Sequence, residues 1–447
     1  MSAAAFASQA WYPVLVADAA SVHTFDGDIA LGALSEAWSR RSAGDALVLV
    51  DRARHVGERV GRVLRPGRAA RLLARMPEAT RVDRWYILPG TGGSHTLLPR
   101  SAAGFASGTG FLPGGRPIWR VAREVLRRGA RLAPGLGLDE LVIATKGSSG
   151  PPRIAGLAGR GTQVALSLGV PGPVRKAVAR AVDARGQVLG VAKLPLTPHA
   201  RERIQHEGDA MAALRDDLAP RLIDRDDDAW LWMEDLNGRR SGDHLGPEHT
   251  ELLARLTVDA AAVPIGEVQV YRSAIRKLAV SPPRDRALAL ALEELSLALR
   301  AVAEQELVCA AAHGDFTPWN IVHTAAGLRA FDWEFHLAQA PALFDPIHFI
   351  LQTAVLVEHV APRELFACVQ RACAGALAAY LRRLSIDAHD VPMHLALYLL
   401  HQAMLDDGLH RIERPTFAQV DWLRDARLEL ARRVTRELGG VRQKVGA

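Results

Sequence analysis

Residues 309–345 constrain this chain more than any other stretch, because they hold four polar side chains at fixed spacing beside apolar, strand-like sequence. His313 and Asp315 come first, and Asn320 stands five residues after Asp315. Asp332 follows twelve residues later, at the end of a second strand-like run. A polar turn between two buried strands is the alternative interpretation, and it suits one short motif better than four residues that match at once. The spacing therefore favours a functional cluster.

These four side chains are of the types that phosphoryl transfer from ATP requires. A carboxylate must accept or orient the proton of the attacking hydroxyl group, and an amide oxygen and a second carboxylate must hold Mg²⁺ across the phosphates. Asp315 suits the first role, and we predict Asp315 and His313 as the catalytic residues. Asn320 and Asp332 suit the second, because Mg²⁺ prefers hard oxygen ligands. Positioning and charge neutralisation would then supply most of the catalysis.

The sequence H-G-D-F-T-P-W-N-I, followed by F-D-W-E, resembles the catalytic core of the aminoglycoside phosphotransferase and choline kinase-like superfamily. The resemblance covers residues 163–436. It implies an α+β, protein-kinase-like two-lobed fold, with a small antiparallel-sheet N-lobe that holds ATP and a helical C-lobe that holds the acceptor. The chain has no long activation segment and no A-P-E motif, which favours a small-molecule kinase over a protein kinase. Asp345 matches the superfamily's later aspartate, usually a brace for the catalytic loop, although a helix N-cap is the alternative.

The expected N-lobe begins with a three-stranded meander over residues 163–194. Gly169 and Gly172 fall in its first turn, where glycines would let backbone N–H groups approach phosphates. Their G-x-x-G spacing departs from the G-x-G-x-x-G of protein kinases. Further along, W-L-W-M-E-D-L resembles the fifth strand and hinge of the superfamily. We therefore predict that Glu234 and Leu236 contribute backbone contacts to adenine.

Lys193 ends the third strand of that meander in V-L-G-V-A-K, which is close to the V-A-I-K pattern of kinases. A helix is expected over residues 199–214, and Glu207 lies inside it. The kinase-like interpretation pairs Lys193 with Glu207 and lets the lysine hold the α- and β-phosphates. Glu202 is the second candidate partner. The alternative is a lysine that snorkels to solvent beside a solvated glutamate.

The chain has 447 residues, which is too long for one ordinary domain and suggests two or three. We predict a separate small α/β domain over residues 1–145 and a linker rich in glycine, serine and proline over 146–162. The N-lobe would follow over 163–236. A mostly helical C-lobe over 237–447 would carry the catalytic and metal loops. The first domain could cap the N-lobe, bind a partner or be a degenerate enzyme domain.

Within residues 1–145 the pattern alternates between short apolar runs and amphipathic stretches. No G-x-G-x-x-G follows the first apolar run, so the sequence predicts no dinucleotide-binding loop there. The expected elements are strands at 46–50, 84–88 and 141–144, helices at 65–76 and 118–132, and a loop rich in glycine, proline and serine at 89–117.

Charge divides the chain unevenly. Residues 1–200 carry a formal charge of +14 and the remainder −8, against +6 for the whole chain. A basic half could bind nucleic acid or an anionic surface. No nucleic-acid motif accompanies the charge, so we favour solvated helix faces and expect no nucleic-acid partner. An acidic second half agrees weakly with a cationic acceptor.

The chain has three cysteines, too few for a disulfide framework, and no C-x-x-C pair. It has no run of eighteen apolar residues and no basic segment before its alanine-rich start, so we expect neither a membrane span nor a signal peptide. These features predict a cytoplasmic protein. They do not determine its oligomeric state.

The predicted reaction is ATP + R–OH → ADP + R–O–phosphate, with Mg²⁺ as the metal cofactor. The small-molecule hydroxyl acceptor could be an amino sugar, a sugar, or a choline-like or amino alcohol. Two alternatives stay open: a catalytically silent kinase-like nucleotide sensor, and a protein that binds a partner through its basic half. Several tail residues could line an acceptor pocket, although surface carboxylates and core aromatics are the favoured interpretation: Asp406, Asp407, Glu413, Tyr398 and Trp422.

Overall fold

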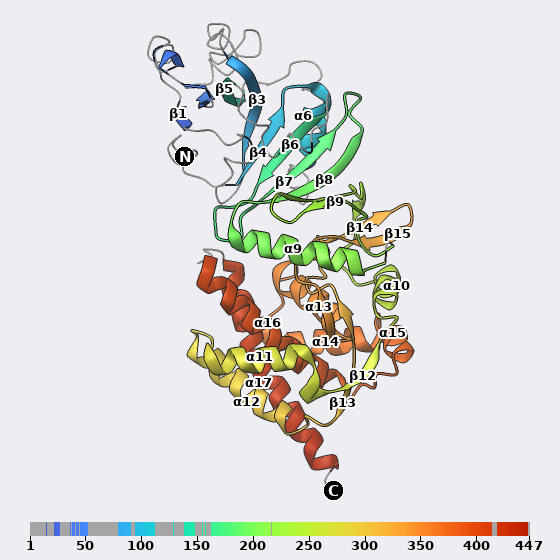
Figure 1. Cartoon of the computed structure of the whole chain (residues 1–447). Coiled ribbons are helices and arrows are strands. Elements are labelled where there is room, and N and C mark those ends of the chain that lie inside the picture. The colour runs from blue at the N-terminus through green and yellow to red at the C-terminus, as the bar shows by residue number, and fades with distance from the viewer. Residues whose placement is uncertain are drawn as a thin grey trace. The chain divides into compact units, whose positions relative to one another are not determined.

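The computed structural model of the chain describes residues 162–215, 217–413 and 418–445 without a break. Before residue 162 it describes shorter pieces: 15, 22–26, 36, 38–40, 42–43, 45–51, 79–90, 94–111, 128, 138–147, 154 and 157. The chain divides into two compact units, Met1–Gln205 with Leu222–Asp235 and His206–Arg221 with Leu236–Ala447 (Figure 1).

A ten-stranded sheet forms the described part of the first unit. In spatial order its strands run β1-β2-β5-β3-β4-β6-β7-β8-β10-β9. The pair β1 and β2 is parallel, and every other neighbouring pair is antiparallel. The strands are β1 (Val22–Asp26), β2 (Ala46–Asp51), β3 (Ala79–Pro89), β4 (His95–Pro99), β5 (Asp139–Lys146), β6 (Gln163–Leu168), β7 (Lys176–Val182), β8 (Val188–Pro195), β9 (Leu222–Asp226) and β10 (Trp230–Met233).

Strand β7 shows why this part of the sequence forms sheet. Ala177, Ala179 and Ala181 are buried, and the intervening Val178 and Arg180 are only half-buried. Successive side chains of a strand point to opposite faces, so alternation with a period of two gives one face to the core. The meander predicted over 163–194 is therefore confirmed as β6, β7 and β8.

The structure does not confirm a separate N-terminal domain. Strand β4 pairs with β6, with Leu97 opposite Leu166, so the sheet continues from the N-terminal strands into the predicted N-lobe. One buried cluster contains Val48 of β2, Ile143 of β5 and Leu194 of β8 together with both of those leucines. Side chains from both sides of the predicted linker thus share one core, because strand pairing is continuous across it.

Of the elements expected before residue 146, the strands at 46–50, 84–88 and 141–144 are confirmed within β2, β3 and β5. The loop expected over 89–117 is wrong in part, because it contains β4, helix α6 (Ala102–Gly108) and the short 3-10 helix η2 (Thr109–Phe111). The Gly, Pro and Ser content of that stretch favoured a loop and outweighed two signals of a buried helix. Phe105 is fully buried, and the Ser101 hydroxyl caps α6 by accepting the Gly104 N–H. The expected helices at 65–76 and 118–132 lie outside the described residues, apart from residue 128.

Helices make up most of the second unit, together with two three-stranded antiparallel sheets. Helix α9 (Pro198–Ala213) begins in the first unit and continues into the second. The other helices are α10 (Pro247–Leu256), α11 (Gln269–Val280), α12 (Arg286–Arg300), α13 (Phe344–Leu356), α14 (Leu365–Ala374), α15 (Ala378–Arg383), α16 (Val391–Glu413) and α17 (Ala418–Val445), with 3-10 turns η3 (Ile265–Glu267) and η4 (Pro362–Glu364). The strands are β11 (Arg239–Arg240), β14 (Ile321–Thr324) and β15 (Gly327–Ala330) in one sheet, and β12 (Ala261–Pro264), β13 (Glu306–Ala312) and β16 (Leu337–Pro341) in the other.

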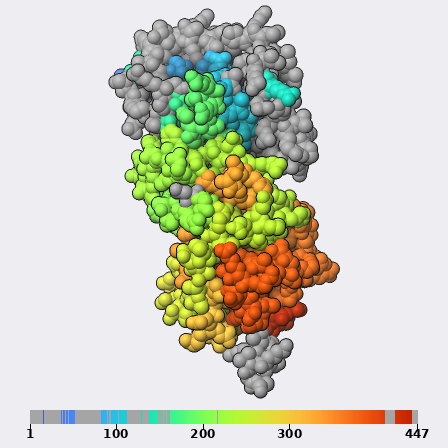
Figure 2. All heavy atoms as spheres, turned by 90° about the vertical axis from the view of Figure 1, so that its right-hand side faces the viewer, coloured from blue at the N-terminus to red at the C-terminus, as the bar shows by residue number. Residues whose placement is uncertain are grey.

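Helix α12 illustrates how the helical part is held together. Asp285 caps its start by accepting the Leu288 N–H at 2.9 Å. Leu292, Leu295 and Leu299 recur at three- and four-residue spacing and are fully buried, each contributing about 2 kcal/mol. This face packs against α16 and α17 (Figure 1). In Figure 2 the C-terminal helices, coloured orange to red, form one continuous block of the surface.

A mixed α+β chain with a large antiparallel sheet and a helical C-terminal region is therefore confirmed. Among the helices that the structure describes, none has both the length and the apolar character needed to cross a membrane.

Candidate active site

The β14–β15 hairpin brings two of the predicted site residues to the same end. Asn320 directly precedes β14 and Asp332 lies two residues after β15. The hairpin opens with Ile321 opposite Ala330, and the Phe331 N–H donates to the Asn320 carbonyl oxygen at 2.9 Å. The antiparallel ladder thus places the predicted amide and carboxylate ligands beside each other, although twelve residues separate them.

The loop after β13 is held by a buried carboxylate. Asp345, in the first turn of α13, accepts the His313 N–H at 2.6 Å and the Gly314 N–H at 3.0 Å. Burial raises the pKa of Asp345, opposed by His313 and by these two N–H groups. Leu343, and not Asp345, is the N-cap of the helix. The structure therefore shows that Asp345 braces the loop at residues 313–314 and does not cap α13.

Glycine is the one residue type that fits this loop at position 314. Its φ is +84°, and a Cβ atom there would lie 2.0 Å from the Phe335 carbonyl oxygen. A side chain would therefore suffer both backbone strain and a backbone clash. The G of H-G-D is thus a requirement of the loop's geometry.

His313 is fully buried, and both of its ring nitrogens have partners. Nδ1 lies 3.2 Å from the Asp315 N–H, which donates to it, and Nε2 lies 3.0 Å from the Phe331 carbonyl oxygen, to which it donates. Burial lowers the pKa of His313, so the imidazole stays neutral and keeps this tautomer. The buried ring of His313 contacts the Phe331 carbonyl oxygen and the Asp315 N–H, and its catalytic role stays a prediction.

The carboxylate of Asp315 is held on both oxygens and stays partly exposed. Oδ2 accepts the Asn320 amide N–H at 2.9 Å, and Oδ1 lies 2.9 Å from His348 Nε2. The same Asn320 nitrogen also donates to the Asp315 carbonyl oxygen at 3.0 Å. The Asp315 side chain is 29% exposed, so a ligand can reach it. This arrangement suits a general base, which must be both oriented and accessible.

Sequence reasoning missed His348. It lies three residues after Asp345 on α13, so the two side chains share one face of the helix. Since Asp345 braces the backbone of residues 313–314, a polar residue one turn later could have been expected to face Asp315. That spacing was the available signal.

Asn320 and Asp332 have the properties of cation ligands. The amide nitrogen of Asn320 donates to Asp315, so its amide oxygen is the atom that could coordinate a metal ion. Asp332 has a φ of +70°, a conformation that non-glycine residues adopt rarely and that clusters at functional sites. One amide and one carboxylate oxygen match the one or two protein ligands that Mg²⁺ commonly takes.

Glu207 supports the Asp332 turn from α9. Its buried carboxylate accepts the Trp333 N–H at 3.2 Å. Lys193, its predicted partner, is buried on β8 in the first unit, whereas Glu207 belongs to the second. Their pairing stays a prediction. Glu202 is 73% exposed and lies 3.4 Å from His199, so it is poorly suited to replace Glu207.

The predicted glycine turn is the β6–β7 hairpin turn. The Gly169 N–H donates to the Lys176 carbonyl oxygen at 3.0 Å, so the hairpin itself uses it. Contact of Gly169 with phosphate stays a prediction. A Cβ atom on Gly172 would meet nothing within 4 Å, so its surroundings leave room for a ligand. A phosphate contact at Gly172 stays a prediction.

Glu234 and Leu236 follow strand β10 and are partly buried. Between them, Asp235 forms an ion pair with Arg180 at 2.9 Å, which ties the end of β10 to β7. The chain passes from the first unit to the second after Asp235. Contact of these residues with adenine stays a prediction.

Two of the tail carboxylates considered for an acceptor pocket, Asp406 and Asp407, have partners inside the protein. Asp406 pairs with Arg427, and Asp407 accepts a backbone N–H next to the start of α12 at 3.1 Å. Both line a cavity of about 180 Å³ between α12, α16 and α17. Tyr398 is buried, as the core interpretation expected.

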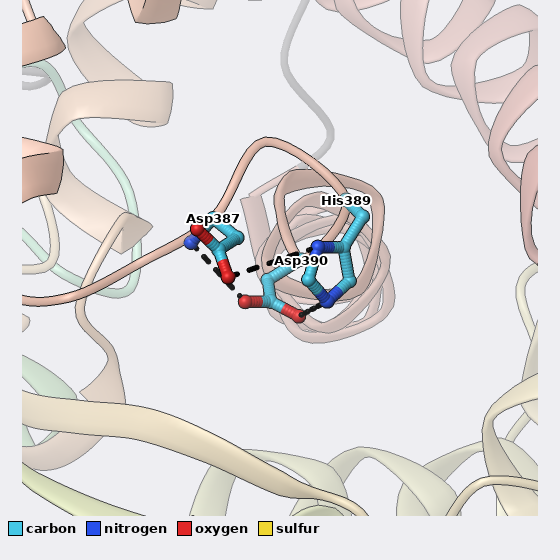
Figure 3. A group of neighbouring side chains, drawn as sticks. All are labelled: Asp387, His389 and Asp390. Atoms are coloured by element: carbon cyan, nitrogen blue, oxygen red, sulfur yellow. Dashed lines mark hydrogen bonds and ion pairs between the residues drawn. The ribbon is translucent and has the colours of Figure 1, made fainter.

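One group of ligand-type side chains lies outside the catalytic segment among the described residues: Asp387, His389 and Asp390 (Figure 3). Asp390 accepts the Asp387 N–H at 3.3 Å and lies 3.2 Å from His389 Nε2. The group is largely exposed and directly precedes α16. These local contacts describe a turn before a helix, and they do not require an ion.

No family model and no curated protein matches this chain. Among solved structures it is similar to choline kinase from Streptococcus pneumoniae, at 13% identity and a TM-score of 0.39, covering 59% of this chain and 89% of that chain. It is also similar to a choline/ethanolamine kinase family protein from Mesorhizobium loti, at 16% identity and a TM-score of 0.41, covering 66% of this chain and 96% of that chain. A third match is a macrolide 2'-phosphotransferase from Brachybacterium faecium, at 18% identity and a TM-score of 0.31, covering 54% of this chain and 89% of that chain.

Proposed function

We propose that this chain is an ATP-dependent phosphotransferase that transfers the γ-phosphate to a hydroxyl group of a small molecule. The observation that supports it most is the contact between Asn320 and Asp315. One amide joins the candidate base to the candidate metal ligand, while the base stays partly exposed. Phosphoryl transfer needs these two functions side by side.

In the proposed reaction Asp315 orients the acceptor hydroxyl group and takes its proton as the oxygen attacks the γ-phosphorus in line. The new O–P bond forms as the bond from the γ-phosphorus to the bridging oxygen of ADP breaks. Asn320 and Asp332 would hold Mg²⁺, which neutralises charge on the phosphate oxygens. Asp345 and His313 keep the loop fixed, so little reorganisation is needed at the moment of transfer.

The remaining predicted residues would bind the nucleotide. We assign Lys193 to the α- and β-phosphates, Gly172 to the turn over them, and Glu234 and Leu236 to adenine. In this proposal the strands β6 to β10 of the first unit serve as the N-lobe and the helical second unit serves as the C-lobe of a kinase-like fold. The antiparallel order β6-β7-β8-β10-β9 supports it.

The test is ADP release by purified protein with Mg·ATP across a panel of hydroxyl acceptors. The panel contains choline, ethanolamine, gentamicin, a macrolide and simple sugars, with mass spectrometry to identify the phosphorylated product. We expect one class to stimulate release, and Asp315→Ala to lower the rate by about 10²- to 10⁴-fold. Failure to bind Mg·ATP would overturn the proposal. Binding without turnover of any acceptor would favour the nucleotide sensor.

A further inference from the structure

His348 links the candidate base to the core of the helical region. Its side chain is 2% exposed. Nε2 lies 2.9 Å from Asp315 Oδ1, and Nδ1 lies 3.1 Å from the Tyr398 hydroxyl oxygen of α16. The imidazole thus has one hydrogen-bond partner on each nitrogen, and one of them is the carboxylate of the candidate base.

The partners favour one arrangement of the protons. An ionised carboxylate can only accept, so His348 Nε2 must carry the hydrogen that it donates to Asp315. In the neutral imidazole Nδ1 is then an acceptor, and the Tyr398 hydroxyl donates to it. Burial raises the pKa of Tyr398, so the phenol keeps its proton at neutral pH and remains a donor. The chain of donors runs from Tyr398 through His348 to Asp315.

We propose that His348 is a positioning residue for Asp315, and that Tyr398 holds His348 in the tautomer this requires. The inference rests on the proposed function of Asp315 as the base. The torsion that turns a carboxylate is broad and soft. Asn320 holds one oxygen of Asp315 and His348 holds the other, so the plane of the carboxylate is fixed. Each oxygen keeps a second lone pair that can accept from the acceptor hydroxyl.

Two substitutions at residue 348 separate positioning from packing. His348→Gln keeps an N–H donor near the place of Nε2, and His348→Leu fills similar space without one. We expect His348→Leu to lower kcat by about 10- to 100-fold while KM for ATP stays within about twofold, because misplacement of a catalytic group affects the chemical step. His348→Gln should recover most of that loss.

Tyr398→Phe tests the tautomer, with Tyr380→Phe as its matched control. Tyr380 is also a buried tyrosine, and its hydroxyl donates to the Ala342 carbonyl oxygen at 3.0 Å. Both substitutions remove a buried hydroxyl group together with its hydrogen bonding and should lower the melting temperature. Only Tyr398→Phe should lower kcat, by several-fold, because only Tyr398 contacts His348.

The experiment measures steady-state ADP release with whichever acceptor the panel identifies, and the ¹⁵N NMR spectrum of histidine-labelled protein. The His348 signals, assigned by their loss in His348→Gln, should show the Nε2–H tautomer in the wild type. An Nδ1–H tautomer overturns the proposal whether or not the protein is active. Wild-type kcat in His348→Leu, or equal losses in the Gln and Leu variants, also overturns it and leaves the kinase intact. If the wild type turns over no acceptor, the proposed function fails and the positioning role of His348 fails with it.

Discussion

The amide nitrogen of Asn320 donates to Asp315 twice, at 2.9 Å to the carboxylate and at 3.0 Å to the backbone carbonyl oxygen. This contact fixes the amide so that its oxygen faces away from Asp315. The orientation of the candidate metal ligand and the orientation of the candidate base therefore depend on one side chain. In the proposed function this contact would link Mg²⁺ affinity to catalysis.

Replacement of Asn320 by alanine should therefore damage both functions together. We expect kcat to fall by about 10²- to 10³-fold and the Mg²⁺ concentration for half-maximal ADP release to rise by about tenfold or more. The measurement is a titration of activity with Mg²⁺ at saturating ATP. An unchanged Mg²⁺ dependence in Asn320→Ala would remove this residue from the metal site. The His348→Leu variant is the control, since it should alter kcat without changing the Mg²⁺ requirement.

Replacement of Asp345 by asparagine should loosen the catalytic loop. The amide can accept one of the two N–H groups that the carboxylate holds, and its own NH₂ would face the other. The expected loss is about 2 kcal/mol in the free energy of unfolding, with a fall in kcat. Urea denaturation of Asp345→Asn and of the exposed control Asp387→Asn checks it. Equal stability of the two variants would contradict the bracing role.

Alanine at Gly314 should be far less tolerated than alanine at Gly327. Both glycines have positive φ, +84° and +104°, but only at Gly314 does a Cβ atom meet backbone, whereas nothing lies within 4 Å at Gly327. Backbone strain alone should cost about 1–2 kcal/mol in Gly327→Ala. Overpacking against Phe335 should add about 1–3 kcal/mol in Gly314→Ala and lower kcat. Comparable unfolding free energies for the two variants would show that the loop can move away from the added methyl group.

His394 should make the protein less stable in weak acid. Its side chain is fully buried, and burial lowers its pKa to about 3 from the ordinary 6.5. As the pH falls below 6.5, the unfolded chain binds this proton and the folded protein does not, so stability declines through the window from pH 6.5 toward 3. Between pH 7 and pH 5 the loss from this group is about 2 kcal/mol.

Urea unfolding at the two pH values, for the wild type and for His394→Leu, measures this contribution. The variant should lose less stability between pH 7 and pH 5 than the wild type does. Substitution of the exposed His389 by glutamine should leave the difference unchanged. A wild-type pH dependence in His394→Leu would assign acid sensitivity to other groups.

Much of the candidate site could be predicted because its geometry is local. Asp315 and Asn320 lie five residues apart in one loop, and Asp332 follows a short hairpin, so spacing along the chain nearly determines spacing in the protein. The meander over 163–194 was equally readable, since its alternation has the period of a half-buried strand. The prediction of a loop over 89–117 was wrong in part because the turn-forming residues there flank a buried strand and a helix.

The sequence by itself determined the candidate catalytic segment, the residue types that could perform phosphoryl transfer and the mixed sheet-and-helix character of the chain. Only the tertiary structure decided that β4 joins β6 in one sheet, that His348 contacts Asp315 and that Tyr398 contacts His348. The physical reason is the separation along the chain of the residues that make these contacts. A strand pair or a buried hydrogen bond depends on packing between elements distant in the chain, and no local pattern records which elements will meet.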